Sequence, residues 1–70
     1  MDVKSEIAGK VWKIVAAVGD SVDEDDEIVI LESMKMEIPV VAPKAGRIAE
    51  ILVEADESIQ EDQVIARIEA

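Results

Sequence analysis

One lysine in the sequence has neighbours unlike those of the other lysines. Lys35 lies between Met34 and Met36, and this group is flanked by Glu32 and Glu37. Most lysines are solvated surface residues, and those at positions 4, 10, 13 and 44 have no comparable setting. A lysine amine on its flexible four-carbon stem can be acylated, and the attached group can then swing through a wide arc. Lys35 is therefore the first candidate for a modification site.

The composition excludes most other chemistry. The 70 residues include no cysteine, no histidine and no tyrosine. A thiolate nucleophile, a cysteine-ligated zinc ion and the commonest general base are therefore all missing. A protonated lysine is a poor nucleophile unless an outside enzyme removes its proton. We expect Lys35 to be the substrate of another enzyme and the chain itself not to be an enzyme.

Charge and hydropathy limit the partners. The 17 acidic and 7 basic side chains give a formal net charge of −10, which repels nucleic acids and anionic membrane surfaces. The longest wholly apolar run, residues 14–18, is much shorter than the roughly 20 residues of a membrane-spanning helix. No charged-then-apolar leader opens the sequence. We expect a cytoplasmic protein that binds neither nucleic acid nor membranes.

The apolar residues indicate a folded, all-β domain. Half of the residues are apolar, which argues against disorder in this acidic chain. Valine and isoleucine contribute 10 residues each, whereas leucine contributes 2. Because β-branched side chains are stiff and suit a pleated surface, this choice favours strands. We expect a single domain over residues 1–70.

The two halves of the sequence resemble each other at an offset of 37 residues. At this offset, glycine aligns with glycine, apolar residues with apolar residues and acidic residues with acidic residues. Examples are Gly9 with Gly46, Val11 with Ile48, Asp20 with Glu57, Val22 with Ile59 and Leu31 with Ile68. Such a repeat predicts two four-stranded sheets related by a pseudo-two-fold axis, in a small sandwich or barrel. Lys35 has no partner at this offset within the 70 residues.

Short β-prone runs separated by glycine or acidic turn residues predict eight strands and no helix. We expect strands near residues 2–6, 11–15, 21–22, 27–33, 36–41, 47–54, 58–59 and 64–69. In a two-fold arrangement, the turn at residues 34–35 lies at one end of the molecule and the two termini lie at the other.

The turn at residues 34–35 breaks two local rules. If these are the central residues of a two-residue hairpin, Ser33 faces Met36 and Glu32 faces Glu37. Favoured turns of this length have positive φ at both central positions, where asparagine and glycine are usual. Like charges directly opposite each other cost on the order of 0.2–1 kcal/mol. Two such departures at one place indicate function.

The segment from Glu32 to Glu37 closely resembles the attachment motif of biotinyl domains, whose core is Met-Lys-Met preceded by alanine or serine. The resemblance covers essentially the whole chain and is strongest to small free-standing biotin attachment proteins of bacteria. It implies the biotinyl/lipoyl hammerhead fold, a flattened eight-stranded barrel-sandwich hybrid with the attachment lysine on an exposed β-hairpin. The positions that carry the fold pattern are Gly9, Val11, Gly19, Asp20, Val22, Ile28, Leu31, Pro43, Gly46 and Ile48.

The resemblance also implies roles for the tip residues. Lys35 would receive biotin from a biotin protein ligase, with Met34 and Met36 as the flanking methionines. Glu32 and Glu37 would help the ligase to recognise the tip. The carrier, expected to be a monomer, would shuttle a carboxyl group between a biotin carboxylase and a carboxyltransferase.

Two alternatives remain open. A lipoyl-type acyl carrier would hold lipoate on the same lysine, although lipoyl sites of this fold usually have aspartate before the lysine and alanine after it. An unmodified interaction module would instead use the acidic surface to bind a basic partner.

The resemblance makes further predictions at the turns. Family members usually have glycine where this sequence has Asp25, Asp56 and Asp62. Aspartate tolerates the left-handed region better than most residues, at a cost of about 0.5–1 kcal/mol each. Gly46 would close the turn that leaves the hairpin, where a residue without Cβ is often needed.

Two other features have simpler expected roles. Trp12 is the only aromatic residue and has no second ring for stacking, so we expect it to pack in the structure. The acidic run at residues 23–27 has no loop glycine or flanking helices of a calcium-binding hand, so we expect a solvated turn that steers partners.

Overall fold

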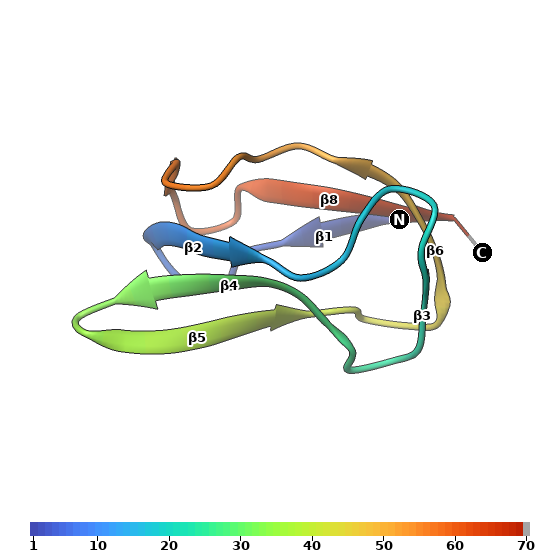
Figure 1. Ribbon diagram of the computed structural model, residues 1–70, viewed down its shortest axis with the longest axis horizontal. Coiled ribbons are helices and arrows are strands. Elements are labelled where there is room, and N and C mark those ends of the chain that lie inside the picture. The colour runs from blue at the N-terminus through green and yellow to red at the C-terminus, as the bar shows by residue number, and fades with distance from the viewer. Residues whose placement is uncertain (70) are drawn as a thin grey trace.

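Two four-stranded antiparallel sheets make up the computed structural model, which describes residues 1–69 (Figure 1). One sheet has the strand order β1-β8-β6-β3 and the other β5-β4-β2-β7. The predicted all-β class and the eight predicted strands are confirmed. The strands are β1 (Asp2–Lys4), β2 (Gly9–Ile14), β3 (Ser21–Val22), β4 (Glu27–Ser33), β5 (Met36–Val41), β6 (Gly46–Ile51), β7 (Ser58–Ile59) and β8 (Val64–Glu69).

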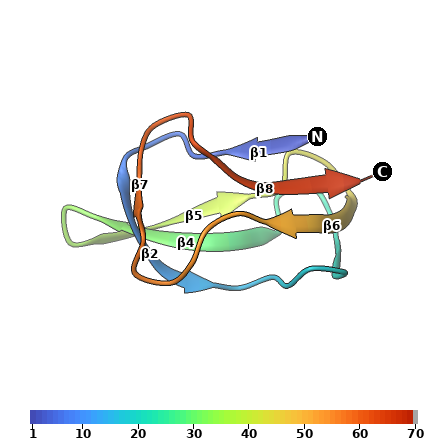
Figure 2. The same ribbon diagram turned by 90° about the horizontal axis from the view of Figure 1, so that it is seen from above.

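Three strands end earlier than the sequence predicts, β2 by one residue and β1 and β6 by two and three residues. β1 stops at Lys4 because the buried Ser5 begins a turn, in which its hydroxyl donates a hydrogen bond to the Ile7 carbonyl. β6 stops at Ile51 because the following segment leaves its sheet and runs beside β2 (Figure 2). There, Val11 accepts a hydrogen bond from the backbone of Asp56. The end of β1 is therefore set by a local turn, and the end of β6 by a contact between distant segments.

The 37-residue repeat of the sequence is also a repeat of the structure. Lys10 lies opposite Glu32 in the β2–β4 pair, and the equivalent Arg47 lies opposite Glu69 in the β6–β8 pair. A register shift interrupts each pair at the equivalent place. The predicted pseudo-two-fold relation between the two halves is therefore confirmed, and it includes these irregularities of strand pairing.

Equivalent residues from both halves build one hydrophobic core between the sheets. The interior strands β4 and β8 supply many of its most deeply buried side chains. Burial of one large apolar side chain stabilises a fold by roughly 1.5–3 kcal/mol. The most deeply buried side chains of β4 and β8 are Ile28, Val29, Leu31, Ile65, Ala66 and Ile68.

The two ends of the molecule differ. It measures 33 × 18 × 18 Å, and the β4–β5 hairpin projects at one end while the start of β1 and the end of β8 lie toward the other (Figures 1 and 2). This confirms the predicted placement of the turn at residues 34–35. Residues 1–69 contain no helix that is long and apolar enough to cross a membrane. The cytoplasmic location stays a prediction.

The left-handed turn positions agree with the sequence, but the reason predicted for one glycine was wrong. Asp25, Asp56 and Asp62 have φ values of 71°, 70° and 66°, as expected for residues that replace glycine. Gly46 has no positive φ. It starts β6 against β8, where a Cβ would lie 2.5 Å from the Glu69 carbonyl oxygen. Close strand packing, and not a turn, therefore requires glycine there.

Candidate functional site

The β4–β5 hairpin has the register that its sequence predicts. Glu32 lies directly opposite Glu37, and Ser33 lies opposite Met36. Farther from the tip, buried residues of β4 fix this register, because a slip by one residue would expose them. The hydrophobic core therefore determines which two residues form the turn.

Met34 and Lys35 are the central residues of that turn. Their φ values are 52° and 64°, which agrees with the two-residue turns that match the twist of paired strands. The left-handed region costs an L-residue roughly 1–2 kcal/mol. Within residues 1–69, no side-chain hydrogen bond or ion pair involves either residue. The turn thus keeps both side chains free.

The side chains at the tip face solvent. Met34 is 92% exposed and Met36 is 62% exposed, and Lys35 is exposed between them. Methionine is flexible and polarisable, so it adapts to differently shaped apolar surfaces. The tip therefore presents one primary amine between two adaptable apolar contacts.

The two glutamates of the site are both exposed. Glu32 also has a basic cross-strand neighbour, Lys10, but the Lys10 ammonium lies 3.9 Å from the carboxylate of Asp56 instead. Neither glutamate belongs to an ion pair in the part of the chain that the structure describes. Both carboxylates are therefore available to a basic partner.

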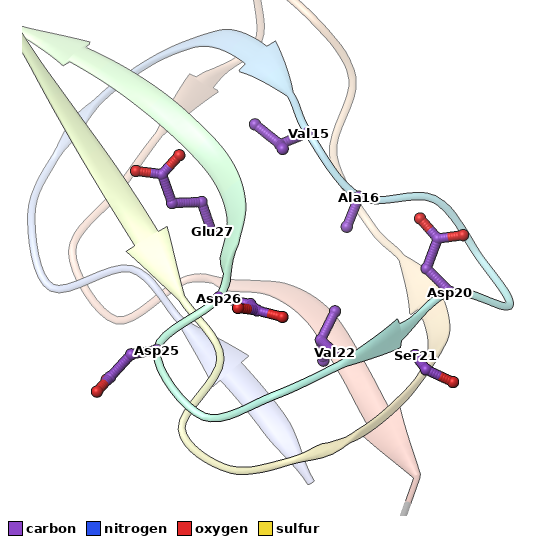
Figure 3. Close-up of a pocket in the computed structure, with 8 residues that line it drawn as sticks. All are labelled: Val15, Ala16, Asp20, Ser21, Val22, Asp25, Asp26 and Glu27. Atoms are coloured by element: carbon purple, nitrogen blue, oxygen red, sulfur yellow. The ribbon is translucent and has the colours of Figure 1, made fainter.

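A large open hollow lies away from the hairpin tip, around β3 (Figure 3). Its volume is about 550 Å³, and it includes part of the predicted acidic turn. Asp25 points away from the hollow, whereas Asp26 folds back and accepts a hydrogen bond from the Asp23 backbone.

Residues 1–69 hold no group of three or more acidic side chains arranged to ligate a metal ion. The acidic residues at positions 23–27 are all exposed.

Trp12 packs less than the sequence predicts. Half of its side chain is exposed. Trp12 is the residue at which the register between β2 and β4 shifts, and the extra residue of a β-bulge leaves the regular ladder. The prediction that Trp12 packs in the structure is therefore only partly confirmed.

Sequence patterns did not predict a second, smaller hollow beside the hairpin. Its volume is about 120 Å³. It forms where β5, the edge of one sheet, passes β1 and the loop after it. These two segments are far apart in the sequence, so no local pattern indicates that they meet. The lining residues are Lys4, Glu6, Ile7, Ile38, Pro39, Val40 and Val41.

Known proteins are similar to this chain in sequence over nearly its whole length. The family model described as biotin-requiring enzyme matches residues 1–68. The Biotin/lipoyl attachment protein of Bacillus subtilis is 37% identical over 97% of this chain and 93% of its own length. The Biotinylated protein TB7.3 homolog of Mycobacterium leprae is 43% identical over 96% of this chain and 94% of its own length.

Two solved carboxylases contain a similar domain. Kluyveromyces lactis urea carboxylase matches 97% of this chain with a TM-score of 0.93 and 38% identity. A single-chain, multi-domain long-chain acyl-CoA carboxylase matches 94% of it with a TM-score of 0.87 and 26% identity. The match spans only 6% of each carboxylase chain.

Proposed function

The chain belongs to the biotin-requiring enzyme family, and from this premise we propose that Lys35 is the residue to which its biotin is attached. The chain is a carrier and not a catalyst, as are the relatives named attachment protein and biotinylated protein. The observation that carries the assignment to Lys35 is its place in the exposed, left-handed turn of the hairpin.

The tip fits an acyl group on the lysine amine. The stem of Lys35 is exposed and projects from the turn, so an amide can form on Nζ without displacing another side chain. When bound, biotin supplies a ureido nitrogen that takes up and gives up a carboxyl group. The two β-strands hold the turn rigidly while the lysine stem stays flexible, which combines a fixed recognition surface with a mobile arm.

The acidic pair has a separate proposed role. Glu32 and Glu37 stand opposite each other at a cost in stability and are free of ion pairs within residues 1–69. We propose that they attract basic groups on the biotin protein ligase. Charges at the rim of an interface act mainly on the rate of association.

Similar domains lie within biotin-dependent carboxylases, so carboxylase components are the partners of this carrier. We propose that these components are a biotin carboxylase and a carboxyltransferase. A hairpin that projects from the end of a molecule 18 Å wide suits entry into two different active sites. For the same reason we propose that the carrier acts as a monomer, because an interface over the tip would block it.

Enzymatic labelling tests this assignment. The intact mass is measured after incubation with a biotin protein ligase, ATP and biotin. We expect a gain of one biotinyl group, no gain in Lys35→Arg, and a normal gain in the matched control Lys44→Arg. An unlabelled wild-type protein that is demonstrably folded, or a labelled Lys35→Arg variant, would contradict the proposal.

A lipoyl carrier is the second candidate, because the Bacillus subtilis relative is named for both groups. The same mass measurement with a lipoate ligase separates the two. We expect biotin to be the preferred group, and lipoylation without biotinylation would reverse this assignment.

A further inference from the structure

The small hollow beside the hairpin lies within reach of Lys35. It opens between β5 and the segment that includes Lys4, Glu6 and Ile7. Ile38, in its lining, is three residues from Lys35, a distance of roughly 10 Å along a strand. A lysine stem lengthened by the acyl chain of biotin spans such a distance.

A row of apolar side chains leads from the tip to this hollow. Alternate residues of a strand point to the same side, so Met36, Ile38 and Val40 share one side of β5. Their exposure falls along the row, from 62% at Met36, through the half-buried Ile38, to 8% at Val40. The exposed methionine therefore begins an apolar path that ends in the core.

The lining has the chemistry that a biotin ring requires. Ile7 and Ile38 give it apolar walls, and the exposed, charged residues Lys4 and Glu6 stand at its rim. Small-molecule sites typically combine apolar walls with a few polar groups that fix orientation. A biotin ring has an apolar thioether side and a polar ureido edge, and a hollow of about 120 Å³ suits one small ring system.

The large hollow around β3 lacks these properties. Its lining includes Asp20, Asp26 and Glu27, and it lies away from the hairpin tip. Its carboxylates would repel a carboxylated ring. Reach and charge therefore both favour the hollow beside β5.

We propose that the hollow beside β5 is a resting site for the biotin ring that Lys35 of the same chain carries. This inference rests on the proposed attachment at Lys35. Docking there shields part of the ring from water between visits to the partner enzymes. The contacts are few, so the ring leaves readily when a partner competes for it.

Nuclear magnetic resonance of the fully biotinylated carrier tests the resting site. We expect nuclear Overhauser effects between the biotin ring and the methyl groups of Ile7 and Ile38, with amide shifts at Ile38 and Val40 relative to the unmodified protein. Shifts confined to residues 33–37, with no such contacts, would overturn the resting site alone. A sample that gains no biotin by intact mass would instead overturn the attachment on which it rests.

A matched pair of variants locates the contact. Ile38→Glu places a carboxylate in the hollow, whereas Ile30→Glu places one on the opposite face of the neighbouring strand, and both positions are half-buried. We expect the ring contacts to disappear in Ile38→Glu and to persist in Ile30→Glu. Persistence of the Ile7 contact in Ile38→Glu would contradict the proposal. The wild-type measurement decides the question even if a variant does not fold.

Discussion

The hairpin tip (residues 34–35) and two equivalent turns of the repeat (residues 23–26 and 60–63, here the paired turns) all contain residues with positive φ, but they differ in what holds the turn. Met34 and Lys35 at the tip, and Asp25 and Asp62 in the paired turns, all have positive φ. Each paired turn is fixed by a side chain. The backbone N–H of Asp23 donates a hydrogen bond of 2.8 Å to the side-chain carboxylate of Asp26. At the equivalent place, the backbone N–H of Gln60 donates one of 3.0 Å to the side-chain oxygen of Gln63. In residues 1–69, no side chain fixes the tip in this way.

This difference separates structural turns from a functional one. The repeated turns use their polar side chains to stabilise their own backbone, and both halves of the molecule do so at equivalent positions. The tip depends only on the pairing of β4 with β5, so its side chains stay available to partners. We therefore expect changes at the tip to alter labelling and changes at the paired turns to alter stability.

The largest effect is expected when the lysine moves by one position. A double variant with Met34→Lys and Lys35→Met keeps the composition and the amine but changes the direction in which the amine leaves the turn. Because a displacement of about 1 Å can cost on the order of 100-fold in rate, we expect ligase labelling to slow by about 100-fold or more. An unchanged initial rate of biotin incorporation would show that the turn does not position the amine.

Removal of a turn anchor should affect stability instead. Asp26→Ala and Gln63→Ala each delete the hydrogen bond that fixes a paired turn, so we expect a loss of roughly 1 kcal/mol in the free energy of unfolding for each. Urea denaturation measures this loss. Met34→Ala at the unanchored tip is the control, and an equal loss there would remove the distinction between the two kinds of turn.

Glycine at two left-handed positions should raise stability at both but slow labelling at only one of them. Asp62→Gly and Met34→Gly both relieve a positive φ, and we expect each to raise the free energy of unfolding by about 0.5–1 kcal/mol. Only Met34→Gly should slow labelling, because only that change removes a side chain from the tip. Equal labelling of both variants, compared at one ligase concentration, would argue against a role for Met34.

The smallest effect is expected at the acidic pair. Glu37→Gln removes one of two like charges that face each other, so we expect a gain in stability of about 0.2–1 kcal/mol. Labelling should slow at low ionic strength and approach the wild-type rate as salt increases. A slowing that is independent of salt would mean that Glu37 contacts the ligase by something other than its charge.

Local patterns in the sequence were sufficient to predict the hairpin. The pairing of Glu32 with Glu37 and the positive φ values of the turn follow once residues 34–35 are the centre of a two-residue hairpin, whereas the left-handed aspartates were predicted from the family resemblance. Contacts between distant segments were not predictable in this way. Gly46 is required by the backbone of β8, Trp12 is exposed by a bulge against β4, and the small hollow joins two separate strands.

We propose that biotin is attached to Lys35, whose turn leaves its side chain free. Fragmentation mass spectrometry of ligase-labelled protein locates the added mass directly. We predict that all of it lies on the fragment that contains Lys35. Biotin on Lys4, Lys10, Lys13 or Lys44, with Lys35 unmodified in a folded sample, would contradict the assignment to Lys35.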